Sequence, residues 1–78
     1  RGGRHVRIVF DGDSSYKPTL SNLVLECQTP VNILFADTRD IDGIAYGQML
    51  LELPDDARQA EKVLAWLRAH EITCREEA

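Results

Sequence analysis

The sequence predicts an α+β sandwich in which two helices cover one face of a four-stranded antiparallel sheet. The apolar pattern changes its period along the chain in the order strand, helix, strand, strand, helix, strand. An Asp-Gly pair at residues 42–43 separates the two middle strand patterns, which is typical of a tight hairpin. With 78 residues, 44% of them hydrophobic, the chain suffices for one core and not for two. We therefore expect one domain over residues 1–78, with its ordered core at about 5–76.

The first three elements follow from local patterns. "HVRIVF" alternates apolar and polar residues, so we expect a strand at residues 5–10 with Val6, Ile8 and Phe10 on one face. "DGDSSYKP" is composed of turn formers and predicts a loop. After it, apolar residues recur at helical spacing from Leu20 to Cys27, and Thr29 and Pro30 end that helix.

The second half repeats the scheme. "VNILFADTRD" and "IAYGQMLLEL" predict the two hairpin strands, at residues 31–40 and 44–53. Helix two is expected from about Asp56 to His70, because Asp56 and Gln59 have the spacing of a capping box. "ITCREE" predicts a short final strand in which Ile72 and Cys74 share a face. The resulting order is that of the split βαβ, or ferredoxin-like, sandwich.

Strict alternation assigns the faces of the two hairpin strands. We expect one set of side chains to face the helices: Val31, Ile33, Phe35, Met49, Leu51 and Leu53. The other set faces away from them: Asn32, Leu34, Ala36, Thr38, Ile44, Tyr46, Gln48 and Leu50.

The uncovered face of this sheet is too apolar for a free monomer. Leu34, Ile44, Tyr46 and Leu50 form a patch that we expect to pack against a second copy or a neighbouring domain. Asn32 lies at its margin. Since a half-buried amide requires hydrogen-bond partners, we expect the partner of Asn32 to be in a turn, in an interface or in a bound polar ligand.

Composition excludes several function classes. A net charge of −4, a pI near 5.0 and nine scattered basic residues argue against a nucleic-acid partner. Cys27 and Cys74 are expected to be reduced core thiols, and neither they nor the two histidines have the spacing of metal ligands. No apolar run approaches the ~18 residues of a membrane span. A beginning without Met favours a fragment of a longer polypeptide.

Several segments together resemble one family. "VNIL" from Val31, "YG" at Tyr46, "LEL" from Leu51 and "AWLRAHEI" from Ala65 are similar to the NIL domain, over about residues 6–75. That family is the C-terminal regulatory region of the ATP-binding subunit of bacterial methionine importers of the ABC class, and its fold is ferredoxin-like and ACT-related. The resemblance agrees with the fold expected from the residues.

The resemblance also implies a function. In the family, two copies of the domain pair, and cytoplasmic methionine bound to them inhibits transport. It implies that Asn32 is the essential ligand contact, with its neighbours Ile33, Leu34, Ala36, Asp37 and Thr38, and that Leu34, Ile44, Tyr46 and Leu50 contact the second copy. The family often has a bulkier or sulfur-bearing side chain near Thr38.

The expected partners follow from the same resemblance. They are L-methionine or a related amino acid, a second copy of the chain, the parent ATPase domain and a membrane permease subunit, with no nucleic acid. We expect no catalytic residue, metal or cofactor in this fragment, and a location at the cytoplasmic face of the cell membrane through the transporter. The alternative is a dimerisation module without a ligand that aligns two ATPase subunits.

Overall fold

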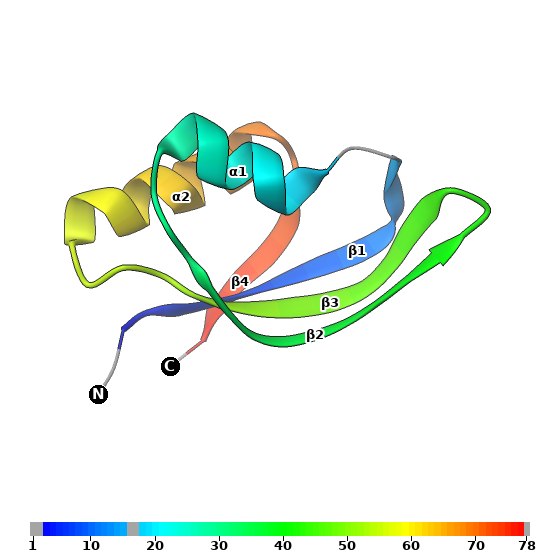
Figure 1. Ribbon diagram of the computed structural model, residues 1–78, viewed down its shortest axis with the longest axis horizontal. Helices are drawn as coiled ribbons and strands as arrows, with labels where there is room; N and C mark the ends of the chain where they lie inside the picture. The colour runs from blue at the N-terminus through cyan, green and yellow to red at the C-terminus, as the bar shows by residue number, and fades with distance from the viewer. Residues whose placement is uncertain (1–2, 16–17, 78) are drawn as a thin grey trace.

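The computed structural model describes residues 3–15 and 18–77 of the chain, and its elements follow the predicted order (Figure 1). The strands and helices, in chain order, are β1 (His5–Ser15), α1 (Thr19–Cys27), β2 (Asn32–Ile41), β3 (Ile44–Glu52), α2 (Ala57–Ala69) and β4 (Thr73–Glu77). The expected α+β, ferredoxin-like βαββαβ fold is confirmed.

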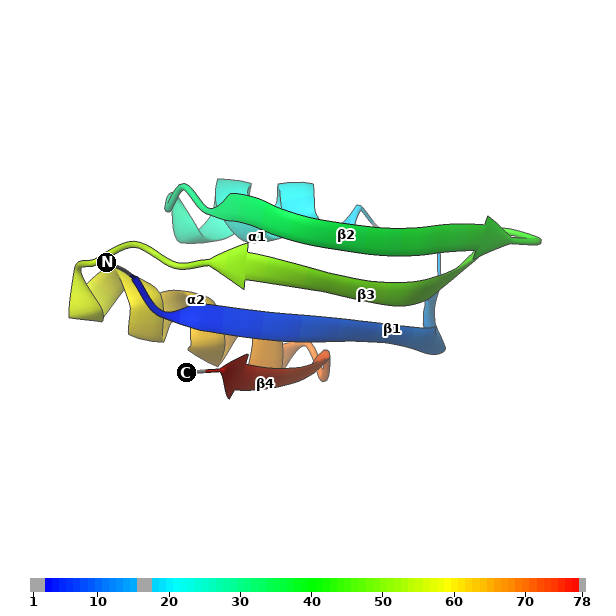
Figure 2. The same ribbon diagram turned by 90° about the horizontal axis from the view of Figure 1, so that it is seen from below.

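The four strands form one antiparallel sheet in the order β2-β3-β1-β4. Figure 2 shows the sheet from its uncovered side, with both helices behind it. β3 and β1 are the central strands, and β2 and β4 are the edges. The fold therefore has one protected face, which we call the helix face, and one unprotected face, which we call the open face.

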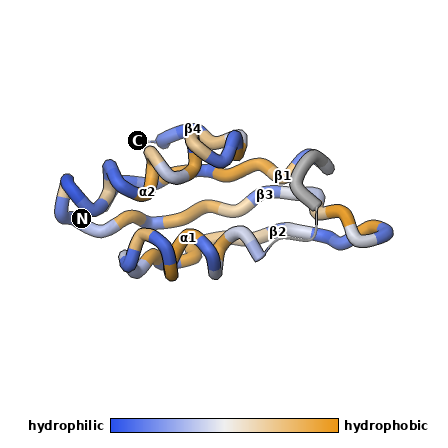
Figure 3. Tube along the Cα trace, turned by 90° about the horizontal axis from the view of Figure 1, so that it is seen from above, coloured by the Kyte–Doolittle hydropathy of each residue, from blue (hydrophilic) through white to orange (hydrophobic). Residues whose placement is uncertain are grey.

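The core lies between the helices and the two central strands, where hydrophobic residues recur along the chain (Figure 3). It consists of Val6, Ile8, Leu23, Cys27, Leu51, Leu53, Ala60, Val63, Leu64 and Leu67, each at most 4% exposed. Phe10, Val31, Met49, Ile72 and Cys74 are partly buried against them. Burial of this apolar area, at roughly 25 cal/mol per Å², supplies most of the favourable free energy of folding.

Short-range interactions fix the element ends. Asp56 is the N-cap of α2, and its Oδ1 accepts hydrogen bonds from the backbone N–H groups of Arg58 and Gln59 at 2.8 and 3.2 Å. The β2–β3 turn has positive φ at both Asp42 and Gly43, 54° and 80°, as a two-residue type I′ hairpin requires. The predicted Asp-Gly turn is confirmed.

Strand β1 is longer than expected. The segment from Asp11 to Ser15, predicted to be a loop, continues the strand to Ser15. Its pairing with β3 shifts register between Asp11 and Ser15, and Gly12 adopts a φ of 95° beneath the ring of Tyr46. The expected loop residues Tyr16 and Lys17 lie outside the described residues. The turn-forming composition thus marks an irregular strand end rather than the end of pairing.

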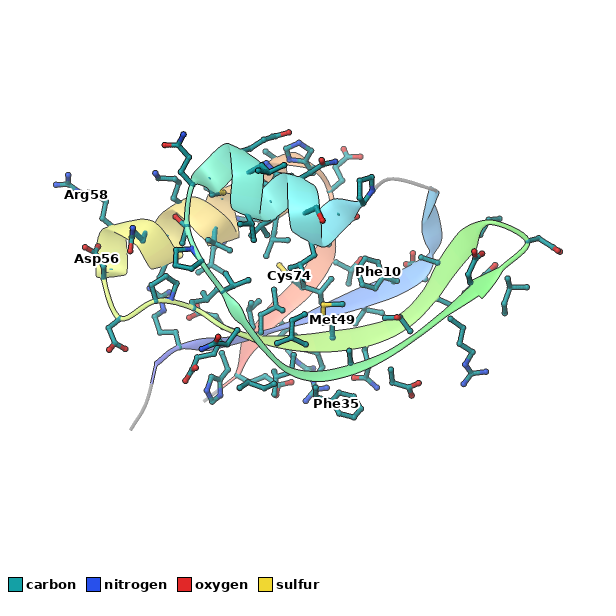
Figure 4. All side chains as sticks on the ribbon, viewed as in Figure 1. Phe10, Phe35, Met49, Asp56, Arg58 and Cys74 are labelled. Atoms are coloured by element: carbon teal, nitrogen blue, oxygen red, sulfur yellow. The ribbon has the colours of Figure 1, made fainter. Side chains whose placement is uncertain are left out.

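Strand β2 contains a bulge that the alternation rule did not anticipate. Ile33 pairs with Leu51, but Phe35 pairs with Leu50, so Leu34 is an extra residue between them. Because of this extra residue, each side chain of β2 after Leu34 lies on the face opposite to the one that strict alternation predicts. The predicted placements of Phe35 on the helix face and of Ala36 and Thr38 on the open face are therefore wrong. Figure 4 shows Phe35 projecting away from the helices.

Candidate functional site

All six residues that the family resemblance implies as ligand contacts lie on β2, an edge strand. Every residue of β2 is exposed, and Ile33, Leu34 and Phe35 have exposed fractions of 51%, 48% and 47%. The strand has β3 on one side, and within residues 3–15 and 18–77 no strand pairs with its other side. This edge therefore has backbone groups and apolar side chains available to another molecule.

Asn32 begins β2 on the open face. Its Nδ2 donates a hydrogen bond to Glu52 Oε1 at 3.1 Å on the neighbouring strand. The other carboxylate oxygen of Glu52 lies 3.9 Å from His5 Nε2 on β1. The Asn32 amide thus has a protein partner in a row of polar groups of which His5 and Glu52 are partly buried. Its carbonyl oxygen and second N–H are the groups it can offer to a ligand.

Thr38 lies further along β2, on the helix face, where it lines a pocket of about 250 Å³. The pocket lies between the start of α1 and the β2–β3 end of the sheet, and is lined by Phe10, Pro18, Thr19, Leu20, Ser21, Thr38, Ala45 and Met49. Phe10 and Met49 are close together beneath α1 (Figure 4). Since Pro18, Ser21 and Thr38 are exposed, the pocket opens to solvent.

The geometry of β2 divides the predicted ligand contacts into two groups. Six residue steps separate Asn32 from Thr38, roughly 20 Å along an extended strand, which is much longer than one amino acid. Between them, Ile33 and Ala36 pair with the helix-face residues Leu51 and Met49, and Asp37 pairs with Gln48 on the open face. Side chains at the two ends of this strand therefore do not meet on one small ligand within one copy.

Other lining residues were not predicted. Ala45 and Met49 come from β3, Phe10 from β1, and Thr19 to Ser21 from the first turn of α1. They are distant in sequence and have ordinary apolar or hydroxyl side chains, so no spacing motif could identify them. The bulge at Leu34, which turns Thr38 toward them, also leaves no compositional signal.

Three of the four residues predicted to contact a second copy, Ile44, Tyr46 and Leu50, lie in an apolar region of the open face, while Leu34 is the bulge residue between Ile33 and Phe35. Tyr46 is 38% exposed, and Ile44 and Leu50 are partly buried. Phe35, which the alternation rule assigned to the core, lies directly beside Leu50 on this face. The open face is thus more apolar near β2 than expected.

Nearer β4, the open face has an ion-pair network. Arg7 on β1 donates from Nη2 to Glu77 Oε1 at 3.1 Å and from Nη1 to Gln48 Oε1 at 2.7 Å. The hydrogen bond from Arg7 lowers the pKa of the Glu77 carboxyl group. The open face therefore has an apolar half at β2 and β3 and a charged half at β1 and β4.

Polar contacts join the two helices, and in one of them Lys62 Nζ donates to the Cys27 carbonyl oxygen at 3.2 Å. Trp66 Nε1 donates to Glu26 Oε1 at 2.7 Å, and the ring of His70 stacks on the indole with centroids 3.9 Å apart. Burial raises the pKa of both the Cys27 and the Cys74 thiols. Within the described part of the chain no group of three metal-ligating side chains converges. These contacts are those of a structural helix pair.

Comparison with known proteins defines the class. The family model of the NIL domain matches residues 4–76, and the chain therefore belongs to the NIL domain family. It is 30% identical over 67 residues to Methionine import ATP-binding protein MetN 2 of Bacillus cereus, and 34% identical over 67 residues to Methionine import ATP-binding protein MetN of Photobacterium profundum. Each alignment covers 86% of this chain and 20% of the relative, so the chain spans about a fifth of the length of these proteins.

A solved structure has the same fold. The C-terminal domain of an ABC transporter ATP-binding protein from Enterococcus faecalis superimposes with a TM-score of 0.82 over 96% of this chain and 83% of that one. Sequence identity is 23%, so this likeness concerns the fold.

Proposed function

We propose that this chain is the regulatory domain of the ATP-binding subunit of a methionine importer, and that it binds cytoplasmic L-methionine to inhibit transport. The proposal rests on the match of the NIL domain family model to residues 4–76. The relatives named for methionine import support the choice of amino acid. The domain acts by binding and not by catalysis.

The pocket beside Thr38 has the chemistry that a small apolar amino acid requires. Phe10, Leu20, Ala45 and Met49 offer apolar and thioether surface to a methionine side chain. The N-cap of α1 is Pro18, whose side chain has no oxygen to accept from the first-turn N–H groups. A ligand carboxylate there would be favoured by the positive end of the helix dipole.

Asn32 serves the second part of the proposed site. Its amide holds Glu52 in place, and an amino acid's carboxylate or ammonium group would use the amide's remaining donor or oxygen. Because Asn32 and Thr38 are far apart on one strand, contacts to both ends come from two paired copies. The six predicted contacts Asn32, Ile33, Leu34, Ala36, Asp37 and Thr38 remain the candidates.

Inhibition follows from linkage. Methionine that binds one arrangement of the paired domains about 10-fold to 100-fold more tightly shifts the transporter toward that arrangement by about 1.4 to 2.8 kcal/mol. The ATPase domain and the permease subunit are the partners whose activity responds to this change in the arrangement of the paired domains, at the cytoplasmic face of the membrane. Among the described residues, neither helix has the length and apolar character needed to cross a membrane.

A second candidate function is dimerisation without a ligand. The observation that favours it is the apolar half of the open face beside the outer edge of β2, which pairs with no other strand of the described residues. This surface would align two ATPase subunits without any bound amino acid.

Isothermal titration of the chain with L-methionine, with D-methionine and L-leucine as controls, separates the two functions. Saturable binding selective for L-methionine supports the sensor. Two variants then locate the site: Asn32→Ala removes the amide, and Ala45→Leu fills the pocket with three additional carbon atoms. We expect each to weaken binding at least about tenfold, a loss of about 1.4 kcal/mol.

Arg58→Gln on the exposed start of α2 is the matched control and should bind as the unchanged chain does. If Ala45→Leu binds normally while Asn32→Ala does not, the pocket is not part of the site. The absence of heat at millimolar L-methionine in the unchanged chain would contradict the sensor and leave dimerisation as the function.

A further inference from the structure

One row of polar side chains crosses the open face at the end of the sheet where β1 begins and β4 ends (Figure 2). Asn32 on β2 pairs with Glu52 on β3. Glu52 also pairs with His5 on β1, and His5 pairs with Glu77 on β4. Directly opposed side chains of antiparallel strands lie on the same face, with Cβ atoms about 4.5 to 5.5 Å apart. The row therefore places an amide, two carboxylates and an imidazole side by side.

The two carboxylates of this row differ in the cations beside them. Glu77 accepts a hydrogen bond from Arg7 Nη2 at 3.1 Å, and a guanidinium group is permanently charged. Among the basic side chains of residues 3–15 and 18–77, only His5 lies within 4.0 Å of the Glu52 carboxylate, with Nε2 3.9 Å from Oε2. An imidazole is a cation only when it is protonated. Glu52 is thus a carboxylate to which the described residues offer no permanently charged partner.

Burial makes this lack of a cation important. The Glu52 side chain is 31% exposed, so the protein removes much of the water that would otherwise solvate its charge. A carboxylate in such a position is stabilised by a bound cation more strongly than one in full contact with water. A ligand with a positive charge is therefore favoured beside Glu52.

Glu52 also determines the orientation of the Asn32 amide. An ionised carboxylate can only accept hydrogen bonds, so the amide must turn its nitrogen toward Glu52, and Nδ2 lies 3.1 Å from Oε1. The described residues offer no hydrogen-bond donor to the Asn32 amide oxygen, and Asn32 is exposed. Asn32 therefore presents a hydrogen-bond acceptor to a ligand, next to a second acceptor that is charged.

We propose that Asn32 Oδ1 and the Glu52 carboxylate together bind the α-ammonium group of the amino acid. An ammonium group has three N–H donors and a positive charge, and hydrogen bonds between charged groups are the strong ones. This inference rests on the proposed function, and it names the end of the amino acid that Asn32 contacts. Glu52 is then a specificity-determining residue, which selects ligands with an ammonium group and rejects the corresponding hydroxy acids.

The opposite orientation of the amino acid is disfavoured by charge. A ligand carboxylate that accepted from the second N–H of Asn32 would lie beside the Glu52 carboxylate. Two like charges at this separation repel each other, and His5 offsets the repulsion only in its protonated form. The ligand carboxylate therefore points away from β3.

Ligand analogues that each lack one charged group test this orientation. The hydroxy-acid analogue of methionine keeps the thioether and the carboxylate, but has a hydroxyl group in place of the ammonium. Methylthiopropylamine keeps the thioether and the ammonium, but lacks the carboxylate. Isothermal titration of the unchanged chain should give the hydroxy acid an affinity at least about tenfold below that of L-methionine, because the contact with Glu52 is lost.

Glu52→Gln isolates the charge of Glu52. The substitution keeps the size of the side chain and an oxygen that can accept from Asn32 Nδ2, but removes the negative charge. Binding of L-methionine and of methylthiopropylamine should weaken at least about tenfold, and binding of the hydroxy acid should change by less than about threefold. The variant thus loses its preference for an ammonium group, an effect that a purely structural role of Glu52 would not produce.

Glu71→Gln is the matched control, because it makes the same chemical change at an exposed residue between α2 and β4. It should bind all three ligands as the unchanged chain does. Thermal melting of both variants within about 3 °C of the unchanged chain shows that the fold is kept.

A heteronuclear NMR spectrum gives a second readout that needs no change at Glu52. The side-chain NH2 signals of Asn32 are identified by their loss in Asn32→Ala. In the unchanged chain they should shift saturably with L-methionine and with methylthiopropylamine, and much less with the hydroxy acid at the same concentration. If L-methionine saturates the chain and these signals do not move, the ammonium group does not bind at Asn32.

The outcomes separate this inference from the proposed function. If L-methionine binds but Glu52→Gln keeps both the affinity and the preference for an ammonium group, the role of Glu52 is overturned and the sensor stands. Equal affinity of the unchanged chain for L-methionine and the hydroxy acid has the same meaning. If methylthiopropylamine binds in a manner that depends on Glu52 and L-methionine gives no heat, the ammonium site is supported and the sensor is overturned. The absence of heat with both ligands overturns both.

Discussion

Phe35 and Leu50 lie directly opposite each other on the open face of the sheet, on the strands β2 and β3. The two residues are paired because Leu34 is an extra residue of β2 between Ile33, which pairs with Leu51, and Phe35. One bulged residue thereby moves an aromatic side chain out of the core and turns Thr38 toward the pocket. The side chains that β2 presents on each face of the sheet therefore depend on that one extra residue.

The bulge makes Phe35 less important for stability than a core aromatic residue. We expect Phe35→Ala to cost less than about 1.5 kcal/mol of unfolding free energy, well below the ~3–5 kcal/mol of a buried phenylalanine. Leu51→Ala on the helix face is the contrast and should cost ~2–5 kcal/mol. Urea unfolding at concentrations below dimer formation measures both, and a larger loss for Phe35→Ala than for Leu51→Ala would contradict the bulge.

Gly47 permits the close approach of β3 to β2. Its φ is 119°, and a Cβ atom there would lie 2.0 Å from the Asp37 carbonyl oxygen and 2.7 Å from Thr38 Cα. We expect Gly47→Ala to cost at least about 2 kcal/mol, because it combines a disfavoured φ with backbone clashes. Gly43→Ala, at a φ of 80° in the turn, should cost about 1 kcal/mol. Equal thermal melting temperatures for the two variants would refute the steric argument.

The Arg7–Glu77 pair makes stability depend on pH. Because the hydrogen bond from Arg7 lowers the folded-state pKa of Glu77 below its ordinary value of 4.5, the pair stabilises the fold above pH 4.5. That contribution decreases as the pH falls from 4.5 through the lowered pKa. Glu77→Gln should melt below the unchanged chain at pH 7, and the gap should close in acid. A gap that stays constant from pH 7 to pH 3 would show that the charge of Glu77 is irrelevant.

Asp56 stabilises the start of α2 by accepting hydrogen bonds from two first-turn N–H groups. Asp56→Ala should cost about 1 kcal/mol of unfolding free energy. Asp55→Ala, which removes the same charge one position earlier, serves as the control and should cost less than half as much. Chemical denaturation at neutral pH measures the unfolding free energy of both variants, and equal losses would contradict the capping role of Asp56.

Much of the fold could be predicted because its signals are local. Periodicity located both helices, and the Asp42-Gly43 pair located the hairpin, since short-range sterics determine these features. The extension of β1 to Ser15 could not be predicted, because pairing with β3 overrides the turn-forming composition there. The bulge at Leu34 likewise depends on the partner strand.

The candidate site shows the same limit. The family resemblance predicted contacts along β2, and of these Thr38 lines the pocket; the other pocket walls come from α1, β1 and β3, whose residues have no distinctive spacing. Their convergence is a property of the packed fold. Whether Asn32 and its five neighbours bind the amino acid stays a prediction that the titrations above test.

The antiparallel pairing of β1 with β4 places His5 opposite Glu77, so both ends of the described chain lie at the same end of the sheet. Tension applied through these two ends would separate β4 from β1 one hydrogen bond at a time, as a zipper opens, and would not shear the whole ladder at once. The domain therefore combines a well-packed interior with low mechanical resistance, and a modest pull would detach its last strand before its core is disturbed.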